Sequence, residues 1–132
     1  MDTEILAANE AFYQAFRRGD PTAMDELWAR HAPVACIHPG WGALLGRDRV
    51  MASWLAIMKN SAPPIRCVAP RVHRLGDAAF VICEEHVGGG RLIATNVFVH
   101  EEGQWRMVHH HAGPLAGREP DDVALSDPHG PN

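Results

Sequence analysis

Three consecutive histidines, His109 to His111, end the last strongly patterned segment of the chain, and no other residues in it are better suited to chemistry. They close a predicted β-hairpin whose strands are residues 95–100 and 104–111. Side chains alternate across a strand, so Met107, His109 and His111 are expected to share one face. That face would pass from bulky apolar groups to imidazoles, which bind or move a proton near neutral pH.

Glu84 is the carboxylate expected to work with His109 or His111. A carboxylate beside an imidazole holds the ring in one tautomer and raises its pKa, which gives an acid and a base near pH 7. Proton abstraction next to a carbonyl would fit such a pair, without an organic cofactor. The expected ligand-binding residues are His38, Trp41, Trp54, His86, Asn96, Phe98 and Met107, with Trp41 at the mouth of the pocket.

Two other interpretations of these histidines stay open. His109 and His111 could simply satisfy one another and the backbone at the end of a sheet, because buried polar groups are usually paired for structural reasons. Alternate histidines on one strand also present two imidazoles to a common point, where His38, His86 or Glu84 would complete a metal site. The spacing to a third ligand is not that of any fixed metal motif.

The face assignment depends on the register of the predicted strands. A turn at Glu102-Gly103 places Asn96 opposite His109, Phe98 opposite Met107, and His100 opposite Trp105. A further turn through the three glycines 88–90 puts Phe80, Ile82, Glu84 and His86 on the Phe98 face. It puts Val81, Cys83 and Glu85 on the Val97 face. A slip of one residue would invert this assignment.

Length and composition limit the class of protein. The 132 residues suffice for one domain, and 46% hydrophobic with 21% charged residues is typical of a soluble globular protein. A formal net charge of −4 gives no reason to expect nucleic acid or an anionic membrane as partner. The acidic start and the lack of a long apolar run favour the cytoplasm. Cys36, Cys67 and Cys83 are expected to be buried thiols.

Apolar periodicity predicts helices first and strands afterwards. Helical spacing covers residues 3–18, 23–30 and 47–59, with Asp20 or Thr22 as cap of the second helix. A short strand at 34–38 lies between the second and third helices. The pattern then changes to period two and predicts a four-strand antiparallel meander: 65–75, 78–87, 91–100 and 104–111. Residues 115–132, rich in proline and aspartate, are expected to form a flexible tail behind a domain of residues 1–114.

This order of elements predicts an α+β fold in which helices cover one face of a curved sheet. Both faces of the predicted sheet carry apolar residues. A second copy of the chain is therefore expected on the uncovered face, which would make a homodimer through the sheet. The residues expected at that interface are Val81, Cys83, Val97, Val99 and Val108.

The segment His38-Pro39-Gly40-Trp41, the element order and the closing run from Trp105 to Pro114 resemble the SnoaL-like branch of the nuclear transport factor 2-like superfamily. The resemblance covers residues 3–114. It implies a cone-shaped, cystatin-like fold with a pocket between helices and sheet, and frequent dimers through the sheet. Members include isomerases, cyclases and dehydratases as well as non-catalytic association domains, so the fold alone does not choose the chemistry. The catalytic aspartates of the polyketide cyclases and steroid isomerases have no counterpart here.

Overall fold

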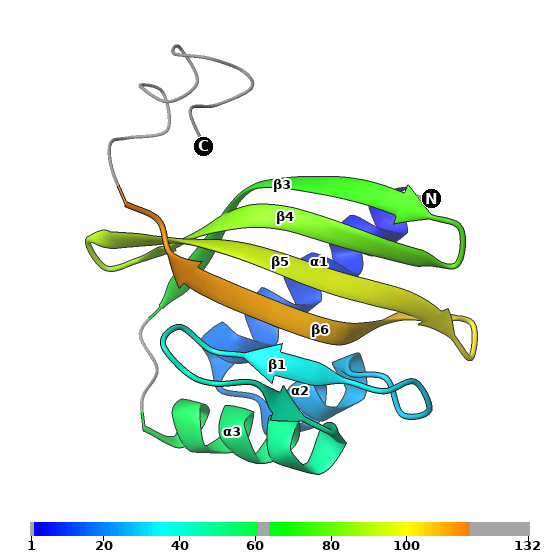
Figure 1. Ribbon diagram of the computed structural model, residues 1–132, viewed down its shortest axis with the longest axis horizontal. Helices are drawn as coiled ribbons and strands as arrows, with labels where there is room; N and C mark the ends of the chain where they lie inside the picture. The colour runs from blue at the N-terminus through cyan, green and yellow to red at the C-terminus, as the bar shows by residue number, and fades with distance from the viewer. Residues whose placement is uncertain (1, 61–63, 117–132) are drawn as a thin grey trace.

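The computed structural model describes residues 2–60 and 64–116, and it confirms the predicted α+β class (Figure 1). Within these residues, helices α1 (Asp2–Arg18), α2 (Pro21–Leu27) and α3 (Arg47–Lys59) pack against one curved sheet. Its strand order is β2-β1-β6-β5-β4-β3. The strands are β1 (Ala35–Ile37), β2 (Leu44–Leu45), β3 (Ile65–Leu75), β4 (Ala78–Val87), β5 (Gly90–Glu101) and β6 (Gln104–Pro114).

The helices form where apolar side chains recur at helical spacing. α1 buries Ile5, Phe12, Tyr13 and Phe16 along one stripe and crosses behind the sheet in Figure 1. α2 begins at a proline, and its cap is Asp20, whose carboxylate accepts a hydrogen bond from the amide of Ala23 at 3.1 Å. α2 ends three residues before the predicted position, because the backbone turns extended at its C-terminal end.

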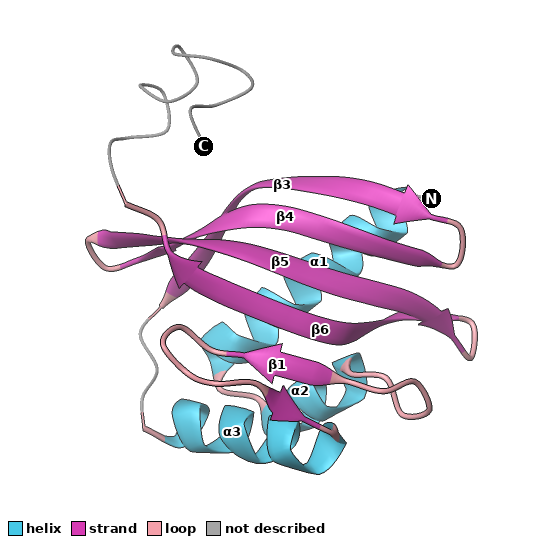
Figure 2. Cartoon of the chain, in the orientation of Figure 1, coloured by secondary structure: helices cyan, strands magenta, loops and turns pink. Residues whose placement is uncertain are grey.

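The predicted meander is present, and two short strands widen it (Figure 2). β3, β4, β5 and β6 pair in sequence order, each antiparallel to the next. β1 then lies parallel to β6, with Ala35 opposite His109 and Ile37 opposite His111. This pairing places His38, just after β1, beside the histidine-rich end of β6. β2, for which the sequence predicts no strand, pairs with β1 in the segment that leads to α3.

The register of the β5–β6 hairpin differs from the prediction beyond Met107. Glu102 and Gly103 form the expected two-residue turn, both with positive φ, and Phe98 lies opposite Met107 as predicted. Val108 is then an extra residue: the next pairs are Val97 with His109 and Asn96 with His110. A bulge of this kind reverses the face of every later residue on its strand. The expected pairing of Asn96 with His109 is therefore wrong.

The face assignment of β4 is also inverted. The prediction used all three glycines 88–90 as the loop. In the structure, the last pair of the β4–β5 hairpin is Val87 with Gly90, so the loop has only two residues. This difference of one residue places Val81 opposite Asn96 and Glu85 opposite Leu92. The face shared with Phe98 and covered by the helices thus carries Ala79, Val81, Cys83 and Glu85, all buried. Phe80, Ile82, Glu84 and His86 lie on the opposite face.

The core lies between the helices and this covered face of the sheet. Trp28, Phe12, Phe98 and Met107 are among its largest fully buried side chains. All three cysteines are free thiols; Cys36 and Cys83 are buried and Cys67 is half-buried. No helix in the described ranges is long and apolar enough to cross a membrane. Residues 117–132 of the predicted tail lie outside the described residues.

Glu101 fixes the tip of the β5–β6 hairpin against the segment that leads into β1. Its carboxylate accepts hydrogen bonds from the backbone amides of Arg30, His31 and Ala32, at 2.8, 3.0 and 3.0 Å. These amides lower the pKa of Glu101 to about 2. The contact holds β1, and with it His38, in a defined position relative to β6.

Candidate functional site

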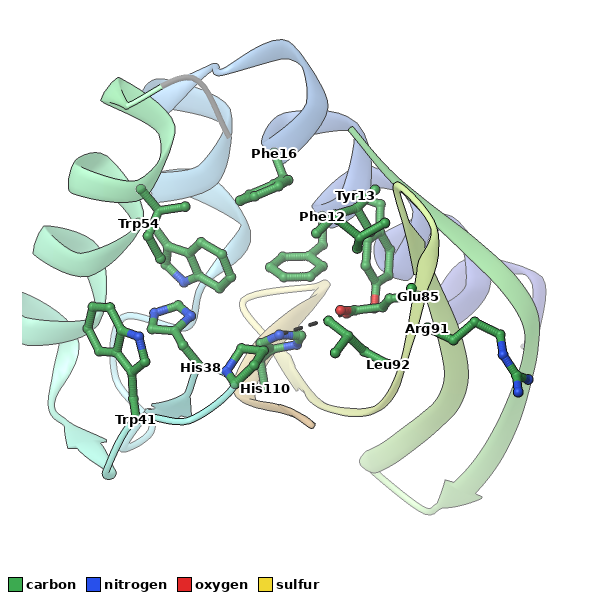
Figure 3. Close-up of a pocket in the computed structure, with 15 residues that line it drawn as sticks. Phe12, Tyr13, Phe16, His38, Trp41, Trp54, Glu85, Arg91, Leu92 and His110 are labelled. Atoms are coloured by element: carbon green, nitrogen blue, oxygen red, sulfur yellow. Dashed lines mark hydrogen bonds and ion pairs between the residues drawn. The ribbon is translucent and has the colours of Figure 1, made fainter. Parts of the chain in front are cut away.

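A cavity of about 420 Å³ opens between the helices and the covered face of the sheet. Its volume is in the range of pockets that hold small molecules. Its walls are mainly aromatic and aliphatic side chains, and Figure 3 shows them grouped around an open centre. The main wall residues are Phe12 and Phe16 from α1, Trp54 and Ile57 from α3, Trp41 from the loop after β1, and Leu92 from β5.

Glu85, His110 and Tyr13 supply the polar groups at the inner end of the cavity (Figure 3). The hydroxyl of Tyr13 donates to Oε2 of Glu85 at 2.6 Å. The same Oε2 lies 3.9 Å from Nε2 of His110. Both side chains are almost completely buried, so an acid and an imidazole face each other in surroundings of low polarity.

Asn96 fixes the tautomer of His110. Its amide nitrogen donates to Oδ1 of Asn9 at 2.8 Å and to the hydroxyl of Tyr13 at 3.1 Å. Its oxygen must therefore be the acceptor of the 2.6 Å contact with Nδ1 of His110. Nδ1 then carries the proton of a neutral His110. The lone pair of Nε2 is left on the side of Glu85, where a base would need it.

The acid and the imidazole both favour their neutral forms. Burial, and to a smaller extent the neighbouring histidines His38, His109 and His111, lowers the pKa of His110 to about 3. Burial raises the pKa of Glu85, partly offset by the hydrogen bond from Tyr13. Burial beside Glu85 raises the pKa of Tyr13 as well. A carboxyl group and an imidazole, each shifted by burial toward its neutral form, therefore lie side by side.

His38 forms the other polar point of the cavity. Ser53 donates its hydroxyl to the carbonyl of Val50 at 2.7 Å, so the 2.8 Å contact is a hydrogen bond from Nε2 of His38 to Ser53. Burial lowers the pKa of His38 to about 4. Its ring lies edge-to-face between Trp41 and Trp54, with ring centroids 4.8 and 4.6 Å away. His38 is thus held neutral and packed as part of the wall.

The structure brings together only part of the predicted site. His38, Trp41 and Trp54 line the cavity, and Trp41 is half exposed at its edge. Asn96, Phe98 and Met107 are buried on the same face of the sheet but do not line the cavity. Asn96 is linked to the cavity by its hydrogen bonds with the wall residues Tyr13 and His110.

The other predicted site residues lie on the far face of the sheet, because of the two register differences. His109 contacts the carbonyl of Ala35 through Nδ1 at 3.1 Å. Glu84 does pair with an imidazole there, at 3.1 Å from Nε2 of His86. The expected acid–base assignment of Glu84, His109 and His111 depended on the opposite face. In residues 2–60 and 64–116, no group of three or more His, Cys, Asp or Glu side chains is placed to hold a metal ion.

Sequence reasoning missed Tyr13, Glu85 and His110 as site residues. Glu85 and His110 are the immediate neighbours of predicted ones, and a shift of one residue exchanges them. Tyr13 lies in the apolar stripe of α1, and nothing in its spacing marks a polar role. Glu84, His109 and His111 thus lie next to Glu85 and His110 in the sequence but on the opposite face of the sheet.

Several known proteins resemble this chain. A family model described as SnoaL-like domain matches residues 5–116. The F-box protein SKIP8 of Arabidopsis thaliana is 32% identical over 111 residues, which make up 82% of this chain and 48% of that protein. The chain therefore spans about half the length of this curated relative.

Two solved structures agree in fold and show substantial sequence identity. One, from Streptomyces avermitilis, is described as a candidate dehydratase of the NTF2-like family; its TM-score is 0.80 at 33% identity, over 87% of this chain and 96% of that one. The other, from Thiobacillus denitrificans, is described as a candidate calcium/calmodulin-dependent protein kinase type II association domain. Its TM-score is 0.75 at 35% identity, over 83% of this chain and 94% of that one.

Proposed function

The chain belongs to the SnoaL-like domain family of the NTF2-like superfamily, and from this premise we propose that it binds a small, largely apolar molecule and acts on it with an acid–base pair. The pair is Glu85 and His110. The observation that carries the proposal is their burial at the inner end of an apolar cavity, with Nε2 of His110 left as the acceptor by Asn96. Such a pair serves proton transfer next to a carbonyl.

The chemistry would follow from the protonation states. Nε2 of His110 takes a proton from the carbon next to a carbonyl and becomes an imidazolium. Neutral Glu85 gives its proton either to a departing hydroxyl, which leaves as water, or to another carbon of the same molecule. The first course is a dehydration and the second an isomerisation. The neighbour from Streptomyces avermitilis, described as a candidate dehydratase, supports the first.

Filling the cavity is expected to abolish ligand binding. Replacing Ile57 by tryptophan puts a large aromatic ring where a smaller aliphatic side chain lines the cavity. Binding of a neutral aromatic ketone, 4-phenyl-2-butanone, should therefore weaken at least tenfold. Chemical-shift titration of ¹⁵N-labelled protein measures this. Leu55→Trp is the matched control, because Leu55 lies on the exposed side of the same helix. Equal binding by the two variants would show that the ketone binds elsewhere.

Proton transfer is tested separately, by exchange of the protons next to the carbonyl of 4-phenyl-2-butanone in D₂O, followed by NMR. The wild-type protein is expected to speed the exchange, and Glu85→Gln and His110→Gln to lower the rate at least about 100-fold, a usual contribution of general acid–base catalysis. Glu84→Gln is the control on the far face. If the ketone binds in the cavity but its protons exchange no faster than without protein, the proposed acid–base chemistry is refuted. The cavity would then remain a binding site.

A second candidate function, dimeric association, is favoured by the far face of the sheet. Phe80, Ile82, Val97 and Val99 form an apolar area there, and Ile93 beside them is 40% exposed. The relative described as an association domain supports this proposal. Of the residues predicted for the interface, Val97 and Val99 lie on this face, whereas Val81 and Cys83 are buried against the helices.

Replacing Val97 by glutamate is expected to convert a homodimer into a monomer, because it places a charge at the centre of the apolar face. Light scattering coupled to size-exclusion chromatography measures the mass. Leu55→Glu, on the exposed side of α3 and away from this face of the sheet, is the control and should leave the mass unchanged. If the wild-type protein is already a monomer, or if Val97→Glu keeps the wild-type mass, this face is not a dimer interface.

A further inference from the structure

A second, polar hollow of about 660 Å³ adjoins the cavity. The two share Ile65, Gly90 and Arg91 as wall residues, so the end of the β4–β5 hairpin and the start of β3 lie between them. Arg17 from α1 and Arg66 from β3 also line the hollow, and Glu10 is the one carboxylate among its described wall residues.

Positive charge is in excess in this hollow. Arg17 contacts Glu10 through Nη2 at 2.9 Å, and Arg91 contacts the nearby Glu84 through Nη1 at 3.5 Å. Glu84 also contacts His86, another wall residue, with 3.1 Å between Oε1 of Glu84 and Nε2 of His86. Arg66 is exposed and has no carboxylate within 4.0 Å among the described residues. Within the described part of the chain, three guanidinium groups thus face two carboxylates, one of which already has two partners.

Arg17 is also fixed in place at the boundary between the two spaces. Its Nη1 donates to the carbonyl of Ile65 at 3.1 Å, and Ile65 belongs to both walls. A guanidinium held in this way presents its remaining donors in a rigid fork, which matches the geometry of a carboxylate.

The inner end of the cavity has the opposite preference. Glu85, His110 and Tyr13 are buried there with pKa values shifted toward their neutral forms, and a charged group placed among them would lose its hydration in an apolar environment. A ligand with an apolar body and one acidic group can satisfy both spaces only in one direction. Its body enters the cavity, and its acidic group stays in the hollow.

We propose that the ligand is an amphipathic carboxylate whose acidic group binds at Arg17 and Arg66. The inference rests on the proposed ligand-binding function of the cavity. It adds the chemical class of the ligand and the direction in which it lies, with the carboxylate far from Glu85 and His110.

The test compares two probes with the same body, 4-phenylbutyrate and 4-phenyl-1-butanol, by NMR titration at low salt. We expect the acid to bind the wild-type protein about tenfold more tightly than the alcohol, and this advantage to shrink in 0.5 M NaCl because salt screens exposed charges. The double variant Arg17→Gln/Arg66→Gln should lose the advantage and bind the alcohol as the wild type does.

The control variant Arg18→Gln/Arg71→Gln makes the same change of net charge outside the hollow. It should still bind the acid more tightly than the alcohol. The single variant Arg66→Gln, which leaves the contact of Arg17 with Ile65 in place, should lose part of the advantage.

The outcomes separate the inference from the function on which it rests. If the alcohol binds the wild-type protein as tightly as the acid, or if the Arg17/Arg66 variant retains the full advantage, the inference is overturned and the apolar cavity remains a binding site. If neither probe shifts the resonances of Trp54 and His110, the proposed ligand-binding function fails, and the inference fails with it.

Discussion

Replacing Asn96 by leucine is expected to lower the free energy of unfolding by roughly 3 kcal/mol. Asn96 is fully buried and makes three side-chain hydrogen bonds, to Asn9, Tyr13 and His110. Leucine has a similar size but leaves Nδ1–H of His110 and the oxygen of Asn9 buried without these partners. Each such group costs about 1–3 kcal/mol, which places the total well above that of an average substitution.

Urea unfolding followed by tryptophan fluorescence measures this effect. Thr95→Val is the matched control, because Thr95 precedes Asn96 on the same strand, lies on the far face and is only half-buried. Its stability should stay within about 0.5 kcal/mol of the wild type. An Asn96→Leu protein as stable as this control would mean that the network between α1 and the sheet contributes no net stability.

Stability is expected to fall steeply as the pH decreases from 6.5 to 4.5. The pKa values of His38 and His110 are lowered from 6.5 to about 4 and about 3, so both stay neutral in the folded protein and take up protons when it unfolds. Glu85, whose pKa is raised, opposes them, because it binds its proton more tightly in the folded than in the unfolded protein. The two histidines alone take up two protons on unfolding, which corresponds to about 2.7 kcal/mol of stability lost per pH unit, and Glu85 makes this slope shallower.

The variant Glu85→Gln tests the sign of each contribution. It removes the opposing group, so the slope should be steeper than that of the wild type. His109, whose pKa is also lowered by partial burial, adds to the slope in the same direction in both proteins. Urea unfolding at a series of pH values gives both slopes. A wild-type stability that does not change between pH 4.5 and 6.5 would show that the histidines are protonated in the folded state.

The sequence was sufficient to predict the elements, because their signals are local. Apolar spacing located α1 and α3, and the dipeptide Glu102-Gly103 between two patterned segments located the β5–β6 turn. β2 could not be predicted, since a two-residue strand is shorter than any periodic pattern. Its pairing with β1 depends on contacts that only the assembled sheet provides.

The residues of the candidate site divide in the same way. His38, Trp41 and Trp54 were assigned to a cavity from a loop signal and a helical stripe, and they line it. Glu85 and His110 were missed because their orientation depends on counting residues across two turns and a bulge. Neither the bulge at Val108 nor the two-residue choice among three glycines leaves a mark in the sequence.

The extra residue at Val108 divides three adjacent histidines between two environments. His110 lies in the dry interior beside Glu85, whereas His109 and His111 lie on the face that is available to another molecule. The residues of two different surfaces are thus interleaved in the sequence of a single β-strand. Evolution can change the residues of one surface without touching the other, and one inserted or deleted residue in this strand would exchange the two sets at once. Relatives with the same fold but different roles could therefore diverge here through very small changes in sequence.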